Sequence, residues 1–207
     1  MAERVTAAYP PEPWNLAGQA YLSIWRVPVS ELPGLPGGVE PVTVGGRAQV
    51  FTAWIDYQEP GRLQYHELLA TVAVRGKRLS GSITDIWVDS EVSLAGGRAL
   101  WGIPKDLAAL DFTHGRTFTA SAATQEDWIA TAAFTPRPSL PVRMPAAFDV
   151  VQMLDGRLKR SPVRATAHPR PAAADWRINE SGPFGFLAGQ RPVLSACLRD
   201  FKIVFGG

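Results

Sequence analysis

The chain has 207 residues, of which 46% are apolar. Its four lysines and seventeen arginines stand against 19 acidic residues, which gives a net charge of +2. This length and composition predict a single domain with a substantial core, spanning residues 1–207. The basic residues are interspersed with acidic ones rather than gathered in a block, which argues against nucleic acid as a partner.

Cys197 is the only cysteine, which excludes an intramolecular disulfide and a cysteine-built metal site. Its surroundings indicate a strand and a buried, inert thiol. The N-terminus has no apolar segment typical of a signal peptide, and no stretch approaches the roughly 20 apolar residues that span a bilayer. We therefore expect a cytoplasmic protein that has no membrane partner.

The first fifteen residues are expected to form an extended arm, because Pro10, Pro11 and Pro13 prevent a regular helix there. Apolar, aromatic and β-branched residues then predict strands between Gly- and Pro-rich turns. Up to the middle of the chain, these strands cover residues 19–29, 41–57 with a break at Gly45 and Gly46, 64–75 and 79–89.

One short helix is predicted over residues 90–100, where an apolar stripe follows Ser90, a candidate N-cap. Strand-like segments then cover residues 108–112, 117–123, 128–134, 158–167 and 193–205. The proline-rich segments 136–145 and 169–171 are interpreted as connectors. Large rings dominate burial in β-rich domains, so core positions are expected for Trp25, Trp54, Trp87, Trp101 and Trp128.

Many strands and few short helices favour a mainly β fold of the α+β kind. A sheet that closes into a β-barrel removes its exposed edges, and we expect this solution here. Such a barrel also offers a pocket for a small molecule.

Lys105 is the lysine whose context indicates chemistry. It follows the predicted helix and the turn Trp101-Gly-Ile-Pro104, where an apolar wall would lower the pKa of its amine and expose the neutral nucleophile. A structural or solvent-facing lysine is the alternative on composition alone. Ordinary surface roles are expected for Lys77, Lys159 and Lys202.

Three motifs around this lysine resemble the acetoacetate decarboxylase family in order and approximate spacing. They are Tyr65-His-Glu67, Trp87-Val-Asp-Ser-Glu91 and Gly97-Arg-Ala-Leu-Trp-Gly-Ile-Pro-Lys-Asp-Leu107. The resemblance is clearest between residues 50 and 112. It implies a β-barrel core with surrounding strands, a homo-oligomer and chemistry without a cofactor. It also implies that Lys105 forms a Schiff base with a ketone and that Glu67 lies in the pocket.

The chain departs from the family pattern at three places. Asp106 stands where the family has a second lysine that lowers the pKa of the first, and a carboxylate close to the amine would raise that pKa instead. Thr52 replaces a second acidic residue. Gly18 and Gln19 stand where the family has an arginine, so the usual group for a substrate carboxylate is missing.

The remaining candidates have weaker patterns. His66, His114 and His168 lie far apart and have no metal-ligand spacing, so we expect no metal. Adjacent strand residues point to opposite faces, and we place Glu67 rather than His66 in the pocket.

Tyr65, Trp101 and Arg98 are candidate substrate-binding residues. An arginine that ties the helix to Asp89 or Glu91 is the alternative role for Arg98.

Two classes of function follow. The first is a lyase that acts on a small keto acid or ketone through a Lys105 Schiff base, with Glu67 moving protons; it includes decarboxylation as well as aldol or dehydration chemistry. The alternative is a non-catalytic β-barrel that binds a small molecule and has lost decarboxylase activity.

Overall fold

The structure is a computed structural model that describes residues 7–139 and 142–207. Its helical elements are η1 (Val29–Glu31), α1 (Glu91–Trp101) and η2 (Gly185–Leu187). Its strands are β1 (Trp14–Pro28), β2 (Thr43–Val44), β3 (Arg47–Gln58), β4 (Tyr65–Val74), β5 (Ser80–Val88), β6 (Lys105–Leu107), β7 (Ala109–Thr113), β8 (Phe118–Ala123), β9 (Trp128–Pro136), β10 (Met144–Leu154), β11 (Arg157–Ile178) and β12 (Leu194–Phe205). None of the helices in these two ranges is long and apolar enough to cross a membrane.

Seven strands form a ring that hydrogen bonds close completely. Their order is β10, β5, β4, β3, β1, β12 and β11, and β11 pairs back to β10. All neighbours in the ring are antiparallel except β10 and β5, which are parallel. The ring confirms the mainly β fold with a closed sheet that the sequence predicts, because closure satisfies strand edges that water would otherwise have to solvate.

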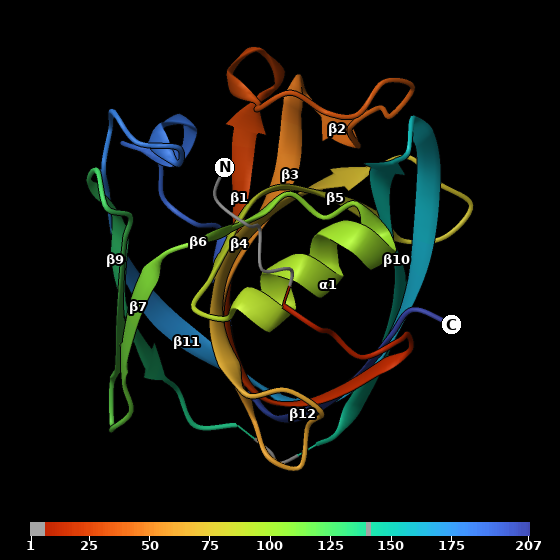
Figure 1. Cartoon of the computed structure of the whole chain (residues 1–207). Coiled ribbons are helices and arrows are strands. Elements are labelled where there is room, and N and C mark those ends of the chain that lie inside the picture. Colours follow the sequence, from red (N-terminus) through yellow and green to blue (C-terminus); the bar gives the residue numbers. More distant parts are fainter. Residues whose placement is uncertain (1–6, 140–141) are drawn as a thin grey trace.

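A second, smaller layer covers one side of the ring (Figure 1). The long strand β11 joins the two, since it pairs with β12 as far as Pro171 and with β9 from Ala172 onward. Strands β8 and β7 continue from β9. The aromatic rings of Tyr21 on β1 and Phe118 on β8 stack 3.5 Å apart between the layers.

The helix α1 lies inside the ring in Figure 1. Trp101 at its end packs in a cluster that includes Ile86, Val150 and Phe201 from the ring strands. The molecule therefore has two cores, one in the ring around α1 and one between the ring and the second layer. Strand β3 contributes to both, and it is buried without interruption from Thr52 to Tyr57.

The segment 144–178 is where the sequence prediction fails most clearly. Residues 136–145 were expected to be a connector, and residues 137–139 and 142–143 do lie between β9 and β10, while residues 140–141 lie outside the described residues. However, β10 already begins at Met144, and no strand was expected over residues 146–154. Residues 169–171 were also expected to be a connector, but they lie within β11. The prolines fit there because this is where β11 exchanges one partner strand for another, so fewer ladder hydrogen bonds depend on their nitrogens.

Two smaller expectations also change. The first strand begins at Trp14, so the extended arm is shorter than residues 1–15, and residues 1–6 of that arm lie outside the described residues. Trp128 was expected in the core, but it is the first residue of β9 and 42% of it is exposed.

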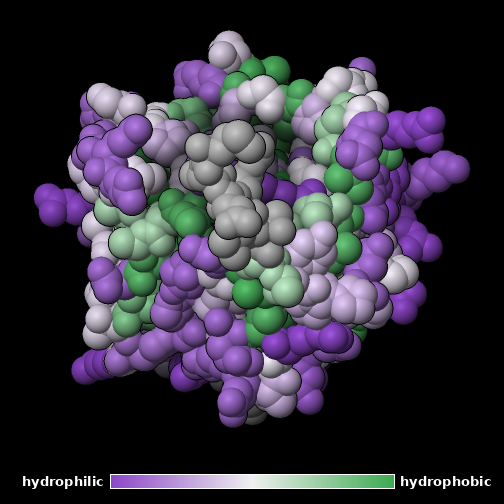
Figure 2. All heavy atoms as spheres, in the orientation of Figure 1, coloured by the Kyte–Doolittle hydropathy of each residue, from purple (hydrophilic) through white to green (hydrophobic). Residues whose placement is uncertain are grey.

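Figure 2 shows one face of the molecule, on which hydrophilic and hydrophobic side chains are mixed. Hydrophilic side chains cover most of its periphery, and hydrophobic side chains show in separate patches between them. Scattered apolar exposure of this kind is ordinary for a folded chain.

Trp54 tests the core between the two layers. It is fully buried, stacks on Trp176 and meets Phe112 edge to face. We expect Trp54→Ala to lower the free energy of unfolding by about 3–5 kcal/mol through lost packing. Trp128→Ala, at the exposed position, should lower it by less than about 1 kcal/mol. Chemical denaturation of both variants measures the difference, and equal losses would contradict this assignment of the core.

Candidate active site

Lys105 begins β6 and points into the ring. Parallel pairing with β5 places it opposite Ile86, and the alternation along a strand buries Lys105 while Asp106 and Leu107 stay exposed. Only 4% of Lys105 is exposed. A lysine is rarely buried to this extent unless its charge is paired.

Three oxygen atoms surround the amine. Lys105 Nζ lies 2.7 Å from Glu67 Oε2, 2.8 Å from Ser93 Oγ and 3.4 Å from the hydroxyl of Tyr65. An ammonium group has three N–H donors, so each can be directed at one of these acceptors. The site is therefore built to hold the protonated amine.

Glu67 is as buried as the lysine and is fully partnered. Its second oxygen, Oε1, accepts a hydrogen bond of 3.2 Å from the hydroxyl of Tyr57. Tyr57 and Tyr65 face each other across the β3–β4 pair, with ring centroids 4.4 Å apart. The two rings shield the ion pair, which strengthens its electrostatic attraction relative to water.

The helix α1 supplies Ser93, one of the three acceptors of the amine, and leaves space for the Lys105 side chain at Gly97. The hydroxyl of Ser90 caps the helix by accepting from the Ser93 backbone N–H, as the sequence predicts. One turn later, a Cβ at Gly97 would lie 2.7 Å from Lys105 Cδ, so only glycine leaves space for the side chain. Arg98 then donates from Nε to the Lys105 carbonyl at 2.7 Å.

Two opposing effects determine the pKa of Lys105. Burial is the larger single effect and lowers the pKa, but the Glu67 carboxylate and the Tyr65 hydroxyl together outweigh it, and the pKa lies above 10.5. Burial also raises the pKa of Tyr65 to about 12. At rest the site thus holds a lysine ammonium beside two neutral tyrosines, since burial raises the pKa of Tyr57 as well.

Asp106 points away from the amine. Its carboxylate accepts from the backbone N–H of Leu107 at 3.0 Å and lies 3.8 Å from Arg98 on the exposed surface. The charge that raises the pKa of Lys105 therefore comes from Glu67 and not from its chain neighbour. Thr52, at the second departure from the family pattern, accepts a hydrogen bond from the Trp25 indole.

His66 and Glu67 lie on opposite faces of β4, but His66 and not Glu67 lines the open cavity described below, whereas Glu67 was expected in the pocket. The ring nitrogen Nδ1 and the backbone nitrogen of His66 lie 2.7 and 2.8 Å from the two oxygens of Asp89. These hydrogen bonds raise the pKa of His66. Asp89 immediately precedes the N-cap of α1, so this pair ties the start of the helix to the strand that carries Glu67.

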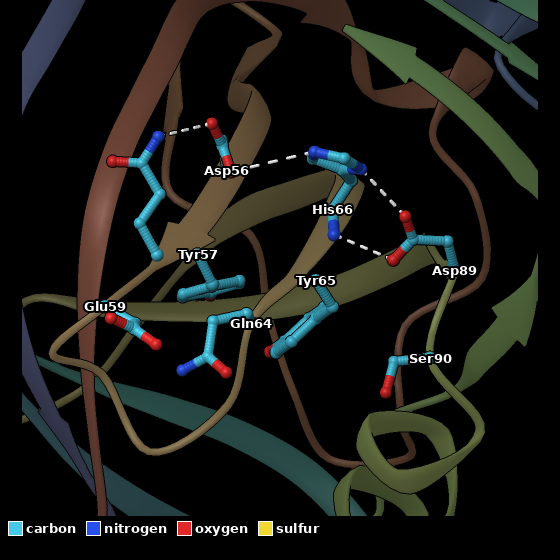
Figure 3. Close-up of a pocket in the computed structure, with 9 residues that line it drawn as sticks. Asp56, Tyr57, Glu59, Gln64, Tyr65, His66, Asp89 and Ser90 are labelled. Atoms are coloured by element: carbon cyan, nitrogen blue, oxygen red, sulfur yellow. Dashed lines mark hydrogen bonds and ion pairs between the residues drawn. The ribbon is translucent and has the colours of Figure 1, made fainter.

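An open cavity of about 600 Å³ adjoins the site (Figure 3). Figure 3 shows His66 between Asp56 and Asp89, with the rings of Tyr57 and Tyr65 side by side beneath them. The cavity is lined by Asp56, Tyr57, Gln58, Glu59, Gln64, Tyr65, His66, Asp89 and Ser90. Because its lining includes Tyr57 and Tyr65 but not Lys105, these two rings separate the amine from the open space.

The structure brings together three of the five residues that the sequence singled out, namely Lys105, Glu67 and Tyr65. Arg98 bonds the backbone of Lys105 and approaches Asp106, so the expected tie to Asp89 or Glu91 is not formed. Trp101 was a candidate substrate-binding residue, but its indole N–H donates a hydrogen bond to Glu12, at 2.7 Å.

Sequence reasoning missed Ser93 and Tyr57. Tyr57 could have been found as the residue opposite Tyr65 if the predicted strands 41–57 and 64–75 had been paired with each other. Ser93 lies one helical turn after the predicted cap, but nothing in the sequence directs its hydroxyl at Lys105.

Across residues 7–139 and 142–207, no group of three or more His, Cys, Asp or Glu side chains is arranged to hold a metal ion. The fold and the site thus define a β-rich protein whose buried amine and carboxylate lie inside a closed ring of strands.

The family model of acetoacetate decarboxylase (ADC) matches residues 3–169. The chain therefore belongs to the acetoacetate decarboxylase family. A search of curated protein sequences finds no match.

Solved structures share the fold at low sequence identity. Acetoacetate decarboxylase from Legionella pneumophila is 19% identical with a TM-score of 0.74, and the match covers 99% of this chain and 89% of that one. The enduracididine biosynthesis enzyme MppR, complexed with pyruvate, is 19% identical with a TM-score of 0.70, over 98% and 91% of the two chains. An acetoacetate decarboxylase-like enzyme from Sphingomonas wittichii RW1 is 12% identical with a TM-score of 0.69, over 96% and 92%.

Gly97 offers a test of how tightly the helix encloses the lysine. Alanine is normally favoured over glycine in a helix by about 1 kcal/mol. Here the added methyl group would displace Lys105 from Glu67, so we expect Gly97→Ala to destabilise the fold by about 1–3 kcal/mol. Gly37→Ala is the matched control, because nothing lies within 4 Å of the Cβ it would add. If denaturation shows Gly97→Ala to be as stable as the parent chain, the close contact is wrong.

Proposed function

We propose that this protein is a lyase that binds a small ketone or keto acid as an imine of Lys105. The observation that carries the proposal is the buried hydrogen bond of 2.7 Å between Lys105 Nζ and Glu67 Oε2. Membership of the acetoacetate decarboxylase family supports it. A buried amine with a carboxylate in contact has both the nucleophile and a proton acceptor in one place.

Glu67 has two roles in this scheme. It first takes a proton from the ammonium, which leaves a neutral amine to attack the carbonyl carbon and form a carbinolamine. The protonated Glu67 then returns the proton to the carbinolamine hydroxyl, which departs as water. The products are an iminium on Lys105 and a Glu67 carboxylate that stabilises its positive charge.

The iminium is an electron sink. It accepts the electron pair released when a β-keto acid loses carbon dioxide, or when a proton leaves the carbon next to the former carbonyl. One lysine thus supports decarboxylation as well as aldol or dehydration chemistry.

Tyr57 and Tyr65 are placed to close the chamber. Their rings lie between the cavity and the Lys105–Glu67 pair, and both hydroxyls point at that pair. Their displacement would admit the substrate, and their return would exclude water and favour the iminium over its hydrolysis.

The charges in the cavity favour an uncharged carbonyl compound. Its nine lining residues include the carboxylates Asp56, Glu59 and Asp89, whereas lysine and arginine are not among them. Gly18 and Gln19 stand where the family has an arginine. A substrate carboxylate would meet repulsion in the cavity, so a ketone or aldehyde is preferred over a keto acid.

A binding protein without catalysis is the second candidate, and one observation favours it. The amine is held by three acceptors and its pKa is raised, so the ammonium form is stabilised and the neutral amine that imine formation needs is disfavoured.

Reductive trapping distinguishes the two candidates. The protein is incubated with acetone, acetoacetate or pyruvate in the presence of cyanoborohydride, and the adduct is located by peptide mass mapping. We expect a reduced adduct on Lys105 with at least one carbonyl compound, and its loss in Lys105→Ala. Lys77→Ala, on the exposed turn between β4 and β5, should react like the parent chain. The absence of any Lys105 adduct would refute the lyase and leave the binding protein.

A further inference from the structure

A second cavity lies far from Lys105 and is lined by three arginines. Arg26 lies near the end of β1, Arg47 begins β3, and Arg191 lies between η2 and β12. Together with Gly189, Gln190 and Val193, they surround a space of about 350 Å³. β1 ends and β3 begins at the upper edge of the molecule in Figure 1.

Backbone hydrogen bonds hold the three segments together. Val193 donates to the carbonyl of Ile24 at 2.8 Å, which fixes the Arg191 segment against β1. Val29 donates to the carbonyl of Gly46 at 3.2 Å, and Pro28 pairs with Arg47 in the β1–β3 register. The convergence of the arginines thus follows from the sheet itself rather than from flexible side chains alone.

Arg47 is also oriented by its own contacts. Its Nε donates to the carbonyl of Arg26 at 3.2 Å, and its Nη2 donates to Gln190 Oε1 at 3.3 Å. Gln190 is fixed in turn by a hydrogen bond of 2.9 Å from its amide nitrogen to the carbonyl of Phe186. These bonds use part of the guanidinium and leave its remaining donors for a ligand.

Neighbouring acids form no ion pair with the three arginines in the part of the chain that the structure describes. In the described ranges, no carboxylate lies within 4.0 Å of any of the three guanidinium groups, and Glu31 contacts Gln190 instead, at 3.3 Å. Arginine stays protonated at all physiological pH values. Three like charges around one cavity repel each other, and a bound anion would relieve that repulsion.

We propose that this cavity binds a phosphate group, either as inorganic phosphate or as the phosphate of a small organic ester. The planar guanidinium fork matches pairs of phosphate oxygens, and three positive charges suit a phosphate dianion better than a single carboxylate. The site is independent of the lyase chemistry, because Arg47 and Tyr57 lie near opposite ends of β3, on the order of 30 Å apart along an extended strand.

Calorimetric titration with phosphate in a fixed sodium chloride background tests the proposal. We expect saturable binding to the full chain and a dissociation constant weakened on the order of tenfold in Arg191→Gln. Gln190→Ala removes no charge but frees Arg47, so it should also weaken binding, by a smaller factor. Arg116→Gln removes an exposed arginine elsewhere and should bind like the parent chain.

Glycerol 3-phosphate and acetate complete the comparison. If glycerol 3-phosphate binds more tightly than phosphate, the ligand is an organic phosphate. If the two bind equally, the ligand is phosphate itself. Acetate should bind weakly in either case. Lys105→Ala should bind phosphate normally, which separates this site from the lyase proposal. The proposal fails if phosphate binding does not saturate, or if Arg191→Gln and Gln190→Ala bind it as tightly as Arg116→Gln.

Discussion

The contact between Lys105 and Glu67 is the interaction on which the interior of the ring depends. Removing two opposite charges from water costs several kcal/mol for each ion, and only close contact and further hydrogen bonds recover that cost. The chain provides both, since Ser93, Tyr65 and Tyr57 form hydrogen bonds with the pair. Ser93 comes from α1, Tyr65 from β4 and Tyr57 from β3. Loss of one partner alone would leave a buried charge uncompensated, at a cost of about 3–5 kcal/mol.

Strand β4 links this pair to the rest of the molecule through two adjacent residues. Glu67 points inward to the lysine, while His66 points outward and binds Asp89 just before α1. The same strand therefore holds both the carboxylate and the start of the helix that carries Ser93. Arg98, on the last turn of α1, donates a hydrogen bond to the backbone carbonyl of Lys105 and so ties the helix to the start of β6. A buried amine needs this double support, because small shifts at either side would lengthen a 2.7 Å contact.

The sequence predicted the parts of this arrangement that depend on local pattern. Alternation located most strands and placed Glu67 and His66 on opposite faces, and the Ser90 cap located α1. Resemblance of the Lys105 motif identified the family. The direction of Asp106 could not be predicted, because it depends on how β6 pairs with β5. β10 was missed because the proline-rich segment 136–145 was interpreted as a connector and no strand was predicted after it. The full length of β11 was missed because Pro169 and Pro171 indicate a connector until the exchange of partner strands is known. Ser93 was missed because its role depends on where α1 lies inside the ring.

The pKa of Lys105 tests the buried Lys105–Glu67 ion pair most directly. Titration of the lysine side chains by carbon-detected NMR, with Lys105→Ala to assign the signal, compares the parent chain with Glu67→Gln. We expect the pKa of Lys105 to lie above its ordinary value in the parent chain, because Glu67 and Tyr65 outweigh burial, and to fall in Glu67→Gln, where burial prevails. Glu59→Gln, at the cavity, should leave the value unchanged. Equal pKa values in the parent chain and in Glu67→Gln would contradict the buried ion pair.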